Sequence, residues 1–280
     1  MKKQFLTASV LAAIGLMQAQ AGTLDNGNLS ISGFGTLGAA KSNTDDIQFV
    51  RYNQAVGVQD SPRIGLDSNL GLQASYQFND MLSATAQVLT RKNTSPQFTT
   101  DLTWAFLKVK INDEISVRAG RVVLPVLAIS DYQNVGYANT MMRPPIEMYG
   151  QMPLEGIDGA DINYQHAFGD TNVTVQGFAG FAKGKLFISA AGLTAKNDTT
   201  AYGFSMSAEH GPVTLRVAHM SGNLTAVGIV PIDNLVKGLS ASGFAQFGHD
   251  LELVKKRVNF NEIGLNLDWN NIVVQTEYTR

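Results

Sequence analysis

Apolar and polar residues alternate with a period of two along most of this chain. The clearest stretch begins at Arg63, where seven of the eight even positions from Ile64 to Phe78 are apolar and none of the odd positions from 63 to 77 is. Alternation of this kind is typical of strands that face an apolar medium on one side only. About fifteen unbroken residues is long for a strand of a soluble protein, which usually has roughly five or six.

The same pattern recurs along the sequence and predicts eleven strands at 29–40, 63–78, 82–91, 101–111, 114–122, 157–168, 172–181, 201–210, 213–220, 258–268 and 272–280. Every second connection is short, at 79–80, 112–113, 169–170, 211–212 and 269–271. The alternate connections are long, at 41–62, 93–98, 122–156, 184–199 and 221–257, and residues 231–247 of the last are expected to form a short helix. Short turns at one end and long loops at the other indicate an all-β fold, a transmembrane antiparallel β-barrel.

The connection 122–156 differs in composition from the others. It holds four of the eight prolines, four of the nine methionines and three tyrosines, together with Asp131, Arg143, Glu147 and Glu155. A loop of more than about fifteen residues is usually functional or disordered, and disorder requires low apolar content and high net charge. We therefore expect an ordered loop that folds into the lumen of the barrel.

The amino terminus predicts export. Lys2 and Lys3 precede an apolar run from Phe5 to Met17 that ends in Gln18-Ala-Gln-Ala21, which is the organisation of a secretory signal peptide. We expect residues 1–21 to be that signal and residues 22–280 to be the barrel domain. No other segment approaches the roughly 18 apolar residues of a membrane helix.

Composition excludes several classes of protein. Of 21 basic and 23 acidic residues, loss of Lys2 and Lys3 leaves 19 basic ones and a net charge of −4, without the basic stripe of a nucleic-acid-binding protein. No cofactor is expected, because Gly33-Phe-Gly-Thr-Leu-Gly38 matches the dinucleotide motif but lies in a strand rather than before a helix. The four scattered histidines have no metal-ligand spacing and there is no cysteine.

The chain resembles the outer-membrane porins of Gram-negative Proteobacteria. The segments that carry the resemblance are 32–39, Arg118-Ala-Gly-Arg121 ahead of the long loop, Arg143-Pro-Pro-Ile-Glu-Met-Tyr-Gly150, and 156–161 beyond it. The resemblance implies a barrel of 16 strands, commonly trimeric, whose third external loop narrows a water-filled pore for passive diffusion. It implies small hydrophilic solutes, ions and outer-membrane lipid as partners, and no enzymatic activity.

The carboxyl end departs from that family. Eleven strands is an odd number and leaves an open sheet edge, and unpaired backbone groups in hydrocarbon cost several kcal/mol each. The sequence ends Glu277-Tyr-Thr-Arg280, without the terminal aromatic residue that the resemblance implies. We expect a chain truncated by about five strands.

Charged residues of the loop and of the polar strand faces are the candidates for the pore constriction. Opposed acidic and basic groups across a narrow pore create a transverse field that favours polar solutes. Arg118 and Arg121 lie three apart, so they cannot both point inward from a regular strand. Some of the arginines are alternatively expected to bind lipid phosphates. The candidates are Arg63, Arg91, Arg118, Arg121, Asp131, Arg143, Glu147, Glu155, Asp158, Asp161 and Arg216.

Two other functions remain open. His219 and Ser221 share one face of a strand, as in a phospholipase-like outer-membrane enzyme, but the sequence offers no evident third group to orient the histidine. An adhesive or structural barrel is the other alternative, in which the long loops bind a partner. Gly33, Gly35 and Ala39 would give the first strand a smooth outer face suited to a homotrimer interface.

Overall fold

The structure is a computed structural model that describes residues 22–24, 27–152, 154–188 and 192–280. The expected signal peptide, residues 1–21, lies outside the described residues. Within them, thirteen strands form one antiparallel sheet. Their bounds are β1 (Gly22–Leu24), β2 (Leu29–Thr36), β3 (Asn69–Gln77), β4 (Leu82–Lys92), β5 (Phe98–Lys110), β6 (Ile115–Val123), β7 (Gly156–Phe168), β8 (Thr171–Ile188), β9 (Leu193–His210), β10 (Val213–Leu224), β11 (Ala226–Val227), β12 (Lys256–Trp269) and β13 (Ile272–Thr279).

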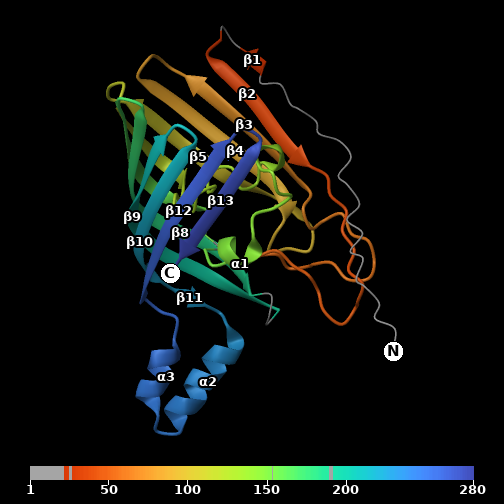
Figure 1. The fold of residues 1–280 in the computed structure, drawn as a ribbon. Helices are drawn as coiled ribbons and strands as arrows, with labels where there is room; N and C mark the ends of the chain where they lie inside the picture. Colours follow the sequence, from red (N-terminus) through yellow and green to blue (C-terminus); the bar gives the residue numbers. More distant parts are fainter. Residues whose placement is uncertain (1–21, 25–26, 153, 189–191) are drawn as a thin grey trace.

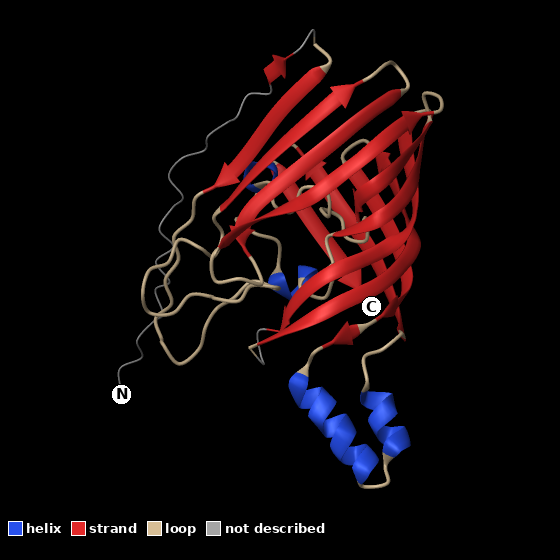
Figure 2. Ribbon diagram, turned by 180° about the vertical axis from the view of Figure 1, so that it is seen from behind, coloured by secondary structure: helices blue, strands red, loops and turns tan. Residues whose placement is uncertain are grey.

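Along the sheet, strands follow one another in sequence order from β1 to β10 and then through β12 to β13, while β11 pairs with β9. The sheet curves strongly, so that its strands surround a concave side on which the green loop and α1 lie (Figures 1 and 2). Among the described residues β1 pairs only with β2, and β13 only with β12, so both edges of the sheet are open. The predicted all-β antiparallel architecture is confirmed.

Period-2 alternation separates the two faces of this sheet, because successive side chains of a strand point to opposite sides. On β9 and β10, Tyr202, Phe204 and Leu215 are 52%, 47% and 57% exposed, whereas Ala201 and Met220 are buried on the other face. The buried side chains face the concave side and the loop within it. An apolar convex face and a covered concave face follow directly from the sequence pattern.

The two ends of the sheet differ as predicted. Tight turns at one end contain left-handed backbone at Gly169 and Gly211, with φ of +62° and +54°, which glycine adopts without a steric penalty. The other end carries the long connections, including a helical hairpin of α2 (Val230–Ala241) and α3 (Ala245–Leu251) that projects from the sheet (Figure 1). The helix expected within 231–247 is confirmed. No helix in the described part of the chain has the length and apolar character needed to cross a membrane.

The connection expected at 184–199 is wrong in its extent. Strands β8 and β9 remain paired from Lys183↔Asp198 up to Ile188↔Leu193. In this extension, polar residues occupy the outer positions Thr194, Lys196 and Asp198. The alternation signal fails here because these outer positions of β9 are polar rather than apolar, although the backbone pairing is uninterrupted.

The strand expected from Arg63 begins only at Asn69. Leu66 and Asp67 are adjacent and both buried, so alternation is already lost. Ser68 Oγ accepts a hydrogen bond from Gly38 N and donates one to Gly38 O, at 3.0 and 3.2 Å, and Gln54 Nε2 donates to the carbonyl of Leu66 at 3.2 Å. Side chains thus occupy backbone groups that a longer strand would have paired.

Gly120 is required where β5 packs beside β6. Its φ is +130°, and a Cβ atom at this position would lie 2.3 Å from the carbonyl oxygen of Ala105. We expect Gly120→Ala to lower the free energy of unfolding by about 1–3 kcal/mol, because it adds backbone strain and a steric clash. Urea unfolding of the folded protein in lipid vesicles measures the change. The control is Gly184→Ala on β8, which has open space around it and should alter stability by less than about 0.5 kcal/mol; equal effects would contradict the prediction.

Candidate functional site

The loop that connects β6 to β7, residues 124–155, packs on the concave side of the sheet. It contains the 3₁₀ turn η1 (Gly136–Ala138) and the single helical turn α1 (Ile146–Tyr149). Val126 and Ile129 are 1% and 2% exposed, and they belong to a cluster that includes wall residues of β8, β9, β10 and β12, namely Phe178, Ala201, Met220 and Phe260. The apolar part of the loop therefore covers the inner wall, as its composition predicts.

Hydrogen bonds hold the first part of this loop against the last strands. Arg216 of β10 donates from Nη2 to the carbonyl of Pro125 at 2.6 Å and pairs through Nη1 with Glu262 of β12 at 2.5 Å. Glu277 of β13 accepts from the backbone N–H of Ala128 at 2.9 Å and from the hydroxyl of Tyr149 at 2.8 Å. Burial raises the pKa of Tyr149, and Glu277 raises it further, so the phenol remains a donor.

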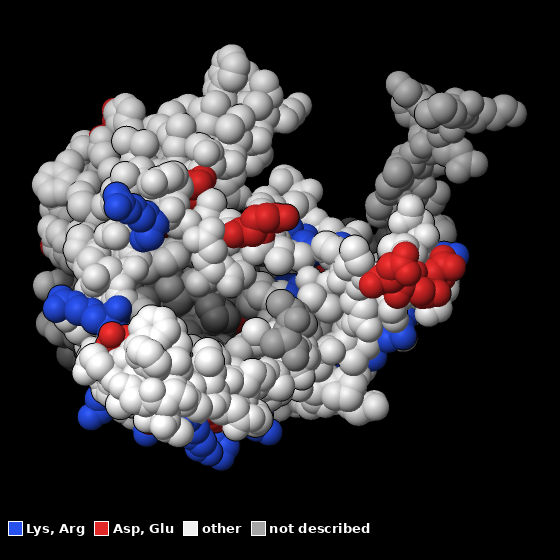
Figure 3. All heavy atoms as spheres, turned by 90° about the horizontal axis from the view of Figure 1, so that it is seen from below, with Lys and Arg blue, Asp and Glu red and all other residues white. Residues whose placement is uncertain are grey.

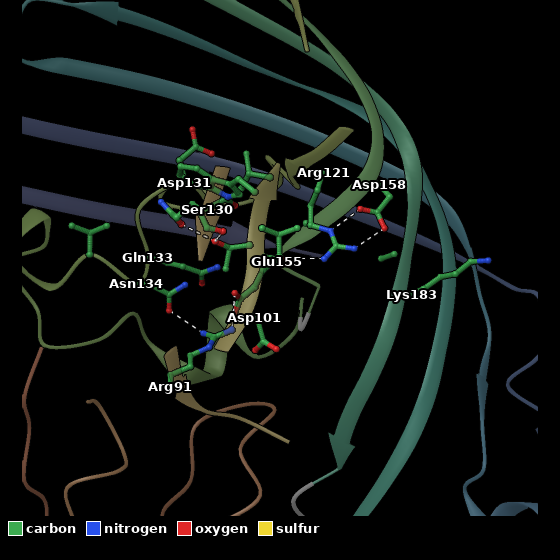
Figure 4. Close-up of a pocket in the computed structure, with 18 of the residues that line it drawn as sticks. Arg91, Asp101, Arg121, Ser130, Asp131, Gln133, Asn134, Glu155, Asp158 and Lys183 are labelled. Carbon is green, nitrogen blue, oxygen red and sulfur yellow. Dashed lines mark hydrogen bonds and ion pairs between the residues drawn. The ribbon is translucent and has the colours of Figure 1, made fainter. Parts of the chain in front are cut away.

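The end of the loop is anchored to β4 on the other side of the concave face. Arg91 Nη2 lies 2.8 Å from both carboxylate oxygens of Glu155, and Nη1 donates to Asn134 at 3.0 Å (Figure 4). Tyr52 donates its hydroxyl to Glu155 at 3.1 Å. Burial by itself would raise the pKa of Glu155, but Arg91 and Tyr52 outweigh it and hold that pKa below its ordinary range. The Glu155 carboxylate is therefore ionised and accepts hydrogen bonds from both Arg91 and Tyr52.

Contacts at β4 and at β13 mean that the loop spans the concave side from one region of the wall to another. Eight steps along the sheet order separate these two strands. Seen from the long-loop end, the molecule is hollowed, and acidic and basic side chains lie around the hollow (Figure 3). A cavity of about 180 Å³ between loop and wall is lined by charged and polar residues that include Arg91, Asp101, Asp131, Gln133 and Glu155 (Figure 4).

Of Arg118 and Arg121, Arg118 is the one that points to the concave side. It forms a bidentate ion pair with Asp161 of β7, with Nη2 2.6 Å from Oδ2 and Nε 2.9 Å from Oδ1. The Asp161 side chain is fully buried and also accepts from Gln176 at 3.0 Å. Asp131 lies on the loop near these groups and is open to the lumen. Its pKa is raised, chiefly because the surrounding wall withdraws it from bulk water, while Arg118 and Arg216 oppose the shift.

Arg121 and Asp158 point to the opposite side of β6 and β7 from Arg118 and Asp161, but both still line the cavity that Arg91, Asp131 and Glu155 line (Figure 4). The register of β6 with β7 is regular from Ile115↔Tyr164 to Val123↔Gly156, so residues three apart point to opposite sides. Arg121 Nε pairs with Asp158 Oδ1 at 2.6 Å, and Arg121 Nη1 donates to the carbonyl of Leu102 at 3.1 Å. This ion pair lies beside the part of β5 that precedes Ala105, which is not paired with β6.

The remaining sequence candidates lie in loops. Arg63 belongs to the connection before β3, where its backbone pairs with Ala40, and therefore is not on the strand wall. Arg143 is tied to the first long loop, 3.2 Å from Asp67 and over the ring of Phe49. Glu147 is exposed on α1. Of the eleven candidates, six face the concave side near the loop: Arg91, Arg118, Asp131, Glu155, Asp161 and Arg216.

Three further residues of the site emerge only from the structure. Glu262 and Glu277 fall on the polar face by alternation, but no local signal connects them to a loop more than a hundred residues earlier. Tyr52 belongs to the first long loop and reaches Glu155 across 103 positions of sequence. Among the described residues, no group of three or more acidic or histidine side chains is arranged to hold a metal ion.

No known family model matches this chain, and no curated protein matches it. Among solved structures, it is similar to the outer membrane channel DcaP of Acinetobacter baumannii, with a TM-score of 0.47, 10% identity, and coverage of 93% of this chain and 66% of that one. OmpT of Vibrio cholerae in its trimer form gives a TM-score of 0.38 at 13% identity, with coverage of 90% of this chain and 77% of that one. The anion-selective porin from Comamonas acidovorans gives a TM-score of 0.33 at 14% identity, with coverage of 90% of this chain and 78% of that one. Because these scores and identities are low, they carry no argument about function.

The Arg91–Glu155 anchor is testable by removing the carboxylate. Glu155→Gln leaves a largely buried guanidinium without its counter-ion, at a cost of about 1–3 kcal/mol. We expect amide hydrogen exchange in residues 131–155 to accelerate by roughly five- to hundredfold, since local opening follows the lost free energy. Hydrogen-exchange mass spectrometry measures it, and Glu147→Gln, an exposed carboxylate of the same loop, is the control.

The same anchor predicts a pH dependence. Since the pKa of Glu155 is lower in the folded than in the unfolded protein, its contribution to stability is present above the unfolded pKa and is lost as the pH falls through the folded one. Loop protection should persist at a pH of about 4.3, where an ordinary glutamate is half protonated, and fall at lower pH. Loss of protection already above that pH would contradict the assignment.

Proposed function

We propose that the chain forms the wall and constriction of a water-filled channel in the outer membrane of a Gram-negative bacterium, through which ions and small hydrophilic solutes diffuse passively. The observation that carries the proposal is the loop 124–155, which crosses the concave side of the sheet and is fixed both to Arg91 on β4 and to Glu277 on β13. A loop held across the inside of a curved sheet narrows the space there without filling it. Adhesion or structural support would not require such a loop.

The convex face supports a membrane location. Large apolar side chains there are exposed on strand after strand, including Leu72 on β3, Leu107 on β5, Ile162 on β7, Leu215 on β10 and Ile263 on β12. Exposed apolar area of this extent is unfavourable in water but suits the hydrocarbon band around a transmembrane barrel. Export through a cleaved signal at 1–21 is part of the proposal.

Charges of both signs line the proposed lumen. Arg118 and Arg216 are each paired within the wall, to Asp161 and Glu262 respectively, and Asp131 faces them from the loop. Such an arrangement orders water and favours polar solutes, while its mixed sign gives only weak preference between anions and cations. Passage of solutes along this path requires no catalytic group, so we propose that the pore itself has no enzymatic role.

Assembly as a homotrimer is a further part of the proposal. Gly33 and Gly35 share the face of β2 opposite Phe34, which is buried on the concave side. Glycines on the convex face permit a close approach of another wall. Crosslinks from a cysteine at residue 33 to lysines of other protomers, with a trimer as the largest product, support this assembly, and their absence in a conducting protein excludes this interface.

Shortening the loop tests the channel directly. Deletion of residues 131–150 removes α1 and the exposed half of the loop, so we expect single-channel conductance of the full-length protein in planar bilayers to rise. Deletion of the α2–α3 hairpin, residues 230–251, is the control, because this hairpin projects away from the sheet (Figure 1). Unchanged conductance after the loop deletion, in a folded protein, would exclude the loop as the constriction.

Asp131→Asn tests the electrostatics. Loss of one negative charge from the path should lower the ratio of cation to anion permeability by up to about fivefold, since two unit charges 4 Å apart in water interact by about 1 kcal/mol. The raised pKa of Asp131 means that the cation-to-anion permeability ratio of the unmodified channel should already fall at a pH above the ordinary value of about 3.9. Reversal potentials in a salt gradient measure both effects, and Asp233→Asn on α2 is the matched control.

A further inference from the structure

A group of polar side chains interrupts the apolar convex face where β10 and β12 run side by side. His219 and Ser221 of β10 point outward, since their neighbours Ala218 and Met220 are buried on the concave side. Their register partners on β12 are Asn261 and Asn259. This group takes no part in the proposed pore, because it lies on the other side of the wall.

Hydrogen bonds connect three of these side chains in a row. His219 Nδ1 lies 2.8 Å from Asn261 Oδ1, and His219 Nε2 lies 3.0 Å from Ser221 Oγ. The amide of Asn261 is oriented by its Nδ2, which donates to the carbonyl of Arg280 at 3.4 Å. Its oxygen therefore faces the imidazole and accepts from Nδ1–H, so the neutral imidazole has its lone pair on Nε2, on the side of Ser221.

This order of groups is that of a nucleophile, a base and an orienting residue. The sequence offered His219 and Ser221 without a third member, and Asn261 supplies it from the neighbouring strand, 42 residues away in the sequence. Ser221 is 4% exposed, and its hydroxyl donates its one hydrogen to Asn259 Oδ1 at 2.7 Å, so in this structure that hydrogen is not directed at His219. Asn259 itself is exposed; an attack by Ser221 requires this amide to move aside, so that the hydroxyl turns its hydrogen toward His219 Nε2.

The surroundings change from apolar to charged along the strands. On the side toward the short turns lie Val217, Phe204 and Ile263, which are 40%, 47% and 61% exposed. On the side toward the long loops lie Asn223 and Arg257, which pair with each other in the register and are both exposed. A molecule with acyl chains, an ester and an anionic headgroup, in that order, matches this gradient along a membrane-facing wall.

We propose that His219, Ser221 and Asn261 form a hydrolytic site that cleaves acyl esters of phosphate-bearing lipids at the convex face. Its position against lipid rests on the proposed membrane location, but its chemistry is independent of conduction through the lumen. The proposal departs from the sequence-based expectation that the chain is not an enzyme.

The reaction runs through an acyl-serine. Ser221 Oγ bonds to the ester carbonyl carbon while its proton passes to His219 Nε2, and Asn261 Oδ1 stabilises the resulting imidazolium through Nδ1–H. The ester C–O bond then breaks, and the leaving alcohol takes the proton from Nε2. Water attacks the acyl-serine and gives its proton to Nε2, and the serine regains that proton as the fatty acid departs.

The test uses the full-length protein in vesicles of phosphatidylcholine that carries a fluorogenic acyl chain. We expect release of the labelled fatty acid, and its loss by about a thousandfold or more in Ser221→Ala and His219→Ala. Asn261→Ala should retain the nucleophile but lose most of the rate, and the pH at which activity is half-maximal should shift because the imidazolium loses its acceptor. Thr276→Ala removes an exposed side-chain hydroxyl from the neighbouring strand β13 and should have no effect.

An alkyl fluorophosphonate gives a second readout that does not depend on the lipid. It should label Ser221 of the unmodified protein, as located by peptide mass, and should not label the His219→Ala variant. Channel conductance of each variant in the same preparation reports folding. A conducting protein that neither hydrolyses the ester nor takes up the label overturns the proposal, as does hydrolysis unaffected by Ser221→Ala, whereas hydrolysis without conductance overturns only the channel.

Discussion

Backbone pairing between neighbouring strands is the constraint from which the other features of this molecule follow. From β2 to β10 each strand is paired with the strands before and after it in the sequence, and such pairing satisfies main-chain groups that would be costly to leave unpaired in an apolar medium. The same pairing forces side chains to alternate between the two faces. Within a regular strand, each residue is therefore assigned to the convex or the concave side by its parity.

Parity explains both the accuracy and the limits of sequence-based prediction here. Each strand expected from alternation overlaps a strand of the structure, and the loop between β6 and β7 begins and ends within two residues of its expected bounds. Prediction fails where apolar and polar residues do not alternate between the two faces. In the β8–β9 extension the outer positions of β9 are polar instead of apolar. Residues 63–68 are held by side-chain hydrogen bonds from Ser68 and Gln54, which the periodicity of the sequence does not reveal.

The site shows a corresponding division. That Arg118 and Arg121 must point to opposite sides follows from their spacing, but which one faces inward depends on the pairing with β7. The partners of the loop are beyond local sequence reasoning, because Tyr52, Glu262 and Glu277 come from segments far along the chain. Asn261 belongs with them, since its relation to His219 exists only through the β10–β12 register. Local patterns identify strands and faces, whereas the combination of charges into a site is a property of the tertiary fold.

The contact between the loop and β13 has a consequence for the order of folding. Ala128 and Glu277 are separated by 149 positions, so their hydrogen bond closes only after nearly the whole described sheet has formed. Contacts of such long sequence separation form slowly, since the entropy of closing the intervening chain must be overcome first. The loop 124–155 therefore reaches its final position late in folding. A folding intermediate in which β13 has not yet paired lacks the contacts of Glu277 that hold this loop at Ala128 and Tyr149.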